Sequence, residues 1–191
     1  MEEKKEFSRD VEYEGPLFEK VESTEKIYEG KIIDVEKLEV SLPSGKKSTR
    51  EILRHNGGAA IVAIDDNDEV FLVRQYRIAA GKELMEIPAG KIEKGEDPAV
   101  CAERELREET GYSAGQMRLL TTLYATPGYC SEKLYVYLAT NLTSGHPHRD
   151  EGEFLKVRKY KLQDLLEMVY EGQISDAKTV AGILLAERYY K

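Results

Sequence analysis

The chain has 191 residues, of which 41% are hydrophobic and 34% charged, so it can bury the core of one ordinary domain or of one domain with an added arm. Its 28 basic and 36 acidic residues leave a net charge of −8, which argues against a DNA or RNA groove because such grooves need clustered lysine and arginine. No run approaches the roughly 18 apolar residues of a membrane span, and the N-terminus MEEKKEFSRD lacks a signal-peptide core, so we expect a cytoplasmic protein that binds neither nucleic acid nor membrane.

The predicted elements begin with an arm and a β-hairpin. Residues 1 to about 24 are polar and predict little structure of their own. Between 27 and 52, two patterned runs flank the turn sequence PSG at 43–45, which predicts a β-hairpin. We therefore divide the chain into an N-terminal arm with its hairpin, residues 1–52, and a main domain, residues 53–191.

The main domain mixes strands and helices without a regular βαβ alternation, which favours the α+β class. Two compact apolar runs, GGAAIVAI and EVFLVRQY, predict strands joined by a polar turn. The remaining predicted elements are strands near 118–125, 133–140 and 153–160 and helices near 97–110, 161–171 and 175–190.

The helix near 97–110 has clear ends and one apolar face. Asp97 is a suitable N-cap, Pro98 suits the first helical position, and Gly111 suits a left-handed C-terminal residue. At about 100° per residue, the stripe that faces the core consists of Ala99, Ala102 and Leu106.

Three glutamates lie in one arc beside this stripe: Glu105, Glu108 and Glu109. At about 5.5 Å and an effective dielectric constant near 20, two carboxylates repel by roughly 3 kcal/mol. A magnesium ion removes that repulsion, because Mg²⁺ prefers oxygen ligands. An exposed, solvated pair, worth only a few tenths of a kcal/mol, is the alternative.

The glutamates belong to a longer pattern, G-x5-E-x7-R-E-L-x-E-E-x-G over residues 90–111. This pattern resembles the signature of the Nudix hydrolases, and every fixed position matches. The following position usually holds an aliphatic residue and here holds Tyr112.

The chain further resembles the ADP-ribose pyrophosphatase branch of that family over about residues 27–190. The segment TPG at 126–128 places a proline 15 residues after Tyr112, with threonine in place of the more usual serine. REI at 50–52 and VRQYR at 73–77 resemble segments that supply substrate-binding arginines, and DEGEF at 150–154 resembles an acidic loop of this branch.

The resemblance implies a mixed β-sheet core flanked by helices and hydrolysis of X-linked nucleoside diphosphates with magnesium or manganese. It also implies a homodimer that exchanges its N-terminal arms, for which the hairpin at 27–52 is the natural candidate.

The resemblance further implies roles for individual residues. The implied metal ligands are Glu105, Glu108, Glu109, the carbonyl oxygen of Ala89, and Glu153. Glu151 would orient or deprotonate the attacking water, although the roles of Glu151 and Glu153 are exchangeable. Arg104 would orient Glu108 one turn later. The implied substrate-binding residues are Arg50, Glu51, Arg77, Lys91, Thr126, Pro127, Gly128 and Glu132.

The expected activity is therefore magnesium-dependent hydrolysis of ADP-ribose to AMP and ribose 5-phosphate. Another nucleoside diphosphate sugar, or an oxidised nucleotide, is the alternative within the hydrolases. A ligand-sensing module without activity is the alternative from another class, but such modules typically lose glutamates of the motif, and this chain retains them.

Overall fold

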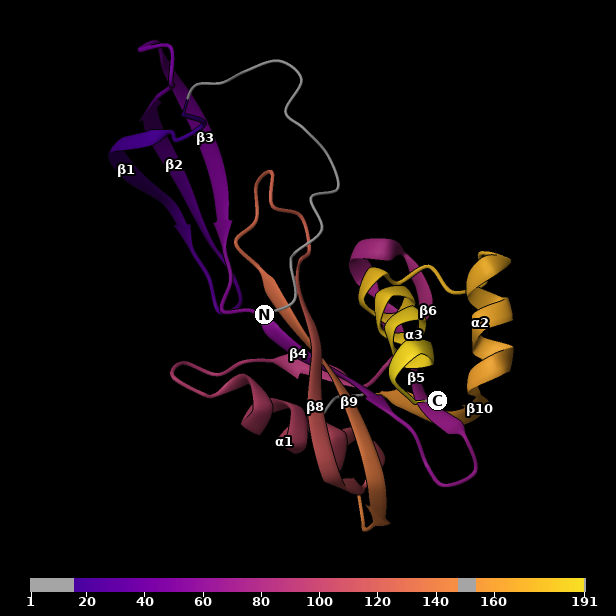
Figure 1. The fold of residues 1–191 in the computed structure, drawn as a ribbon. Helices are drawn as coiled ribbons and strands as arrows, with labels where there is room; N and C mark the ends of the chain where they lie inside the picture. Colours follow the sequence, from indigo (N-terminus) through magenta and orange to yellow (C-terminus); the bar gives the residue numbers. More distant parts are fainter. Residues whose placement is uncertain (1–15, 148–153, 191) are drawn as a thin grey trace, which may run out of the picture. The chain divides into compact units, whose positions relative to one another are not determined.

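The computed structural model describes residues 16–147 and 154–190, and the chain divides into two compact units after Arg54 (Figure 1). The sequence analysis placed its domain boundary after residue 52. The N-terminal unit contains an antiparallel sheet with the strand order β1-β2-β3, whose bounds are β1 Lys20–Glu29, β2 Asp34–Ser41 and β3 Lys47–Arg54.

The predicted hairpin is the pair β2 and β3. Its turn is closed by a hydrogen bond from the Leu42 N–H to the Lys46 carbonyl (2.8 Å), and Gly45 takes the positive φ of 80° that the turn requires. The expectation that residues up to about 24 lack structure is wrong for the last five, because β1 begins at Lys20. All ten side chains of β1 are exposed, so its sequence has no buried face to mark it as a strand.

The second unit is built on a mixed sheet with the order β7-β4-β9-β8. Its strands are β4 Gly58–Ala63, β7 Ala89–Lys91, β8 Tyr112–Tyr124 and β9 Lys133–Ser144. β4 is buried along its whole length and pairs parallel with β9 and antiparallel with β7. The sequence analysis predicted β4 and β9, missed β7, and placed the start of β8 six residues too late.

A smaller antiparallel sheet has the order β10-β5-β6, with β5 Glu69–Arg77, β6 Lys82–Glu86 and β10 Leu155–Lys161. A short 3-10 turn, Ile78–Ala80, connects β5 to β6 and ends at Gly81, whose φ is 65°. β6 was not predicted, because KELME contains one short apolar pair and no alternation.

The described part of this unit also contains three helices: α1 Pro98–Thr110, α2 Leu162–Tyr170 and α3 Ala177–Tyr190. Alternate residues of β4 belong to two different core clusters, one shared with α1 and the other with α2 and α3. The helices therefore pack on both sides of the sheet around β4 (Figure 1), which confirms the α+β class and the mixed sheet flanked by helices.

The ends of α1 agree with the sequence analysis. The side chain of Asp97 accepts a hydrogen bond from the Ala99 N–H (2.8 Å), and Gly111 ends the helix with a φ of 81°. The buried face contains the predicted Ala102 and Leu106 and also Cys101, whereas the predicted Ala99 is only partly buried. The burial of this face sets the rotation of the helix about its axis.

Asp97→Ala is expected to lower the free energy of unfolding by about 1 kcal/mol, because the first turn of α1 loses its cap. Denaturant unfolding of the two proteins measures the difference. Asp97→Asn retains the accepting oxygen and is the matched control. Equal losses in both variants would contradict the capping role.

Candidate active site

A glycine of β7 allows the first glutamate of the motif to pack against the sheet. A Cβ atom at Gly90 would lie 1.9 Å from both Cδ and Oε1 of Glu105, so a larger residue and this carboxylate cannot occupy the site together. The Glu105 side chain is only 12% exposed. The backbone of Gly90 is not in the left-handed region, so close approach explains why glycine stands here.

Arg104 occupies the centre of the glutamate group. Its Nε and Nη2 atoms donate to the two carboxylate oxygens of Glu96 (2.9 and 3.1 Å), and Nη1 donates to Glu105 (2.6 Å) and Glu108 (3.0 Å). These hydrogen bonds, led by those to Glu96, raise the pKa of Arg104, while the hydrogen bond from Arg104 lowers the pKa of Glu96. The sequence analysis placed a cation among these glutamates, and the structure shows a guanidinium there that belongs to the chain.

The third glutamate of the motif is buried. Glu109 is 1% exposed, and its Oε2 atom accepts a hydrogen bond from the N–H of Ala89 (3.2 Å). The structure therefore brings Ala89 and Glu109 together, which the sequence analysis grouped as metal ligands.

The donors at this place are carboxylate and carbonyl oxygens, and their chemistry fits a hard divalent cation. Among residues 16–147 and 154–190, no three His, Cys, Asp or Glu side chains converge as a metal site. Arg104 contacts Glu105 and Glu108. Glu151 and Glu153, which the sequence analysis proposed as water-activating and metal-binding residues, lie outside the described residues.

A cavity of about 600 Å³ lies next to Ala89 and Gly90. Five of the sequence-predicted site residues line it: Arg77, Ala89, Lys91, Thr126 and Glu132. Pro127 and Gly128 follow Thr126 in the connection between β8 and β9 and are not part of the lining. Arg50 and Glu51 belong to β3 of the N-terminal unit, where the Arg50 Nε donates to Glu19 (3.0 Å).

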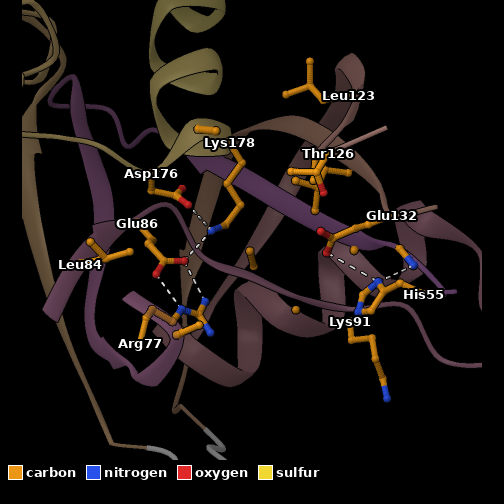
Figure 2. A pocket seen from close by; sticks show the side chains of 18 of the residues that line it. His55, Arg77, Leu84, Glu86, Lys91, Leu123, Thr126, Glu132, Asp176 and Lys178 are labelled. Carbon is orange, nitrogen blue, oxygen red and sulfur yellow. Dashed lines mark hydrogen bonds and ion pairs between the residues drawn. The ribbon is translucent and has the colours of Figure 1, made fainter. Parts of the chain in front are cut away.

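The sequence predicted Arg77 but not the three charged residues linked to it at one end of this cavity, Glu86, Lys178 and Asp176 (Figure 2). Asp176 caps α3, because its carboxylate accepts from the N–H of Thr179 (3.0 Å). The available signal for Asp176 was an acidic residue at the start of the helix predicted near 175–190. Nothing local in the sequence links Lys178 to Glu86, which is 92 residues away.

His55 was also not predicted from the sequence, and it lies beside the predicted Glu132 at the other end of the view in Figure 2. Its Nδ1 atom accepts a hydrogen bond from the Gly57 N–H (3.0 Å) and lies 3.5 Å from Glu132 Oε1. The His55 N–H donates to the Ser131 hydroxyl (3.0 Å), so backbone contacts position this imidazole at the end of β3.

The NUDIX domain family matches residues 54–182. The chain belongs to the NUDIX hydrolase family. This confirms the family and the class of enzyme that the 90–111 motif predicted, and it places the glutamate group of α1 in the matched region.

Two curated relatives match most of the chain. An ADP-ribose pyrophosphatase of Bacillus subtilis (strain 168) is 42% identical over 169 residues, which cover 87% of this chain and 91% of the relative. A methanol dehydrogenase activator of Bacillus methanolicus is 41% identical over 172 residues, which cover 88% and 93%. A solved structure of an ADP compounds hydrolase has a TM-score of 0.78 and covers 95% of this chain and 96% of its own, and its 22% identity supports the fold alone.

In the part of the chain that the structure describes, no helix has the length and apolar character needed to cross a membrane.

Gly90→Ala is expected to displace the Glu105 carboxylate without unfolding the chain, because the obstructing atoms are at the end of a flexible side chain. A misplacement of about 1 Å at a reacting centre reduces turnover by about 100-fold. Steady-state hydrolysis and thermal unfolding measure the two effects.

The matched control combines Gly90→Ala with Glu105→Ala. The new methyl group then meets no carboxylate, so the double variant should unfold at the same temperature as Glu105→Ala alone. Wild-type turnover by Gly90→Ala would contradict the close-packing explanation.

Proposed function

We propose that this protein hydrolyses the diphosphate of ADP-ribose and releases AMP and ribose 5-phosphate. One observation carries the proposal: a cavity of about 600 Å³ joins a charged end, where the half-exposed Arg77 pairs with the buried Glu86, to the Ala89–Gly90 strand against which Glu105 and Glu109 pack. The relative that is 42% identical over 87% of this chain and carries the name ADP-ribose pyrophosphatase supports the same substrate.

Magnesium is the proposed cofactor, with manganese as a substitute. Its ligands would be Glu105, Glu108 and Glu109, the Ala89 carbonyl oxygen, and Glu153. When bound, the ion supplies Lewis-acid polarisation of phosphoryl oxygens and lowers the pKa of a bound water. Oxygen donors of this kind suit Mg²⁺, and the close packing of Glu105 on Gly90 supports the placement.

In this proposal, residues of the chain bind the diphosphate and accept the proton of the attacking water. Arg77 offers a planar guanidinium that forms forked hydrogen bonds with phosphate oxygens. Lys91 and Thr126 line the same cavity and contact the substrate in this proposal. Pro127 and Gly128 do not line the cavity, and their contact with the substrate rests on the family resemblance.

A water molecule attacks one phosphorus atom, and the bond from that phosphorus to the bridging oxygen breaks. Glu151 orients the water and accepts its proton, or Glu153 does so with the roles exchanged. General base catalysis of this kind contributes about 10²–10⁴-fold. Arg104 does not touch the substrate in this proposal; it orients Glu105 and Glu108 through its two contacts from Nη1.

GDP-mannose and oxidised purine nucleotides are the alternative substrates, because the same motif serves hydrolases of other nucleoside diphosphates. The relative named as a methanol dehydrogenase activator does not alter the proposal, because the cavity and the motif both point to a small phosphorylated substrate.

The wild-type chain is expected to produce AMP and ribose 5-phosphate from ADP-ribose only when Mg²⁺ is present, as resolved by chromatography of the products. A panel containing GDP-mannose and an oxidised purine nucleotide, at equal concentration, tests the alternatives. ADP-ribose should have the highest kcat/KM of the panel.

Glu105→Gln retains the size of the side chain and removes the charge, so we expect at least about 100-fold slower turnover with an unchanged unfolding temperature. Glu83→Gln is the matched control, because Glu83 lies exposed on β6. Full turnover by Glu105→Gln would contradict the metal-ligand role, and no turnover of any panel member by the wild-type chain would contradict the enzyme.

We propose in addition that the N-terminal unit forms a homodimer contact by exchange of its arm, residues 1–52. β1 exposes apolar side chains that a second copy would cover, with Ile27 and Tyr28 each 56% exposed and Val21 49% exposed. In such a dimer Arg50 and Glu51 would contact the nucleotide end of the substrate, and these two roles rest on the family resemblance.

Analytical ultracentrifugation is expected to show a dimer of the wild-type chain and a shift towards monomer for Ile27→Lys, which places a charge among the exposed apolar side chains. Lys37→Glu on β2 provides a control that changes charge without removing apolar surface. A monomeric wild-type chain at micromolar concentration would contradict the dimer.

A further inference from the structure

A buried carboxylate, Glu86, pairs with two cations at the charged end of the cavity. Glu86 is 1% exposed, and its two oxygens accept hydrogen bonds from Nε and Nη2 of Arg77, both 2.7 Å. The Nζ atom of Lys178 donates to the same Oε2 that Nη2 contacts. The Arg77 side chain is 42% exposed, so the cation reaches the cavity while its carboxylate partner does not reach solvent (Figure 2).

The two cations keep this carboxylate charged. Burial raises the pKa of Glu86, and the hydrogen bond from Arg77 and the charge of Lys178 outweigh that effect, so the pKa lies below its ordinary value. A buried carboxylate that loses one partner becomes either uncompensated or protonated. A protonated Glu86 would accept less well at one oxygen, and Arg77 would then lose one of its two hydrogen bonds.

Lys178 is itself fixed by the start of α3. Its Nζ atom lies 3.0 Å from Asp176 Oδ1, and Asp176 Oδ2 accepts from the hydroxyl of Thr179 (2.6 Å). That hydroxyl accepts from the N–H of Ile87 (2.9 Å), the residue after Glu86. The first turn of α3 and the end of β6 are therefore joined by two separate contacts, one through the Lys178 ammonium group and one through the Thr179 hydroxyl.

We propose that Glu86 and Lys178 are positioning residues for Arg77, an inference that rests on the proposed hydrolysis of a nucleoside diphosphate. Lys178 holds the carboxylate of Glu86 in its charged form and in one orientation. Glu86 in turn fixes the Nε and Nη2 edge of the guanidinium, so that Arg77 meets the diphosphate oxygens in one geometry. Neither Glu86 nor Lys178 touches the substrate.

The test is the steady-state kinetics of Lys178→Met with ADP-ribose and Mg²⁺. The KM is expected to rise about tenfold and kcat to change less than about threefold, because Arg77 binds the diphosphate in both the ground state and the transition state. Lys178→Arg retains the charge and should restore most of the loss. Lys159→Met, which breaks the 2.6 Å Lys159–Asp65 pair away from the cavity, is the matched control and should retain the wild-type KM.

The Glu86→Gln background distinguishes a positioning role of Lys178 from direct contact between Lys178 and the substrate. Glu86→Gln should raise KM by a similar factor, and Lys178→Met should add less than about twofold to it, because the link to Arg77 is already absent. The double variant Glu86→Gln/Lys178→Met removes one negative and one positive charge together. If Lys178→Met does not fold, Glu86→Gln alone tests the link to Arg77.

An unchanged KM in Lys178→Met, or a further tenfold rise in the Glu86→Gln background, would overturn the inference. A wild-type chain that does not hydrolyse ADP-ribose would instead contradict the proposed function, and the inference would fall with it.

Discussion

The arrangement of the motif depends on the repulsion among its carboxylates and on the guanidinium that offsets it. The Nη1 atom of Arg104 donates to both Glu105 and Glu108. The Nε and Nη2 atoms of the same guanidinium donate to Glu96, which lies in the loop before α1. Without Arg104, two carboxylates at about 5.5 Å beside a core face would repel by roughly 3 kcal/mol at an effective dielectric constant near 20. Because Glu96 supplies the bidentate contact, the loop and the helix form one electrostatic unit.

Steric contact with β7 also fixes the positions of the motif glutamates. β7 has only three residues, yet it pairs with β4 along Gly58–Ala60 and places its own glycine under the Glu105 carboxylate. Ala89, the residue before this glycine in β7, contacts the buried Glu109 through its backbone N–H. A strand fixed to the central strand of the sheet therefore sets the position of two glutamates that come from a helix. This explains why the motif begins on a strand and ends on a helix.

The sequence predicts those features whose causes are local. The caps of α1 depend on residues at its two ends, and its apolar face depends on residues within about two turns of one another; the caps and most of that face are found in the structure. β7 is too short to show a period, and β1 has no buried face. The pair Glu86–Lys178 joins residues 92 positions apart, and no local pattern can reveal such a contact. Hydrogen bonds across the fold, rather than propensity, decide that part of the site.

The two arginines of the site, Arg77 and Arg104, differ in how firmly their carboxylate partners are held. Glu86 is buried at 1% exposure and pairs with two cations, so it can serve Arg77 but cannot leave it for a ligand. Glu108 is 30% exposed and makes a single contact with Arg104, and Glu105 shares the same donor nitrogen. These two carboxylates share one donor nitrogen, so they can turn towards another cation at a smaller free-energy change than Glu86 can. A divalent ion would therefore bind the motif glutamates while Arg104 continues to orient them, and the bidentate contact to Glu96 keeps Arg104 in place. The Arg77–Glu86–Lys178 group stays unchanged.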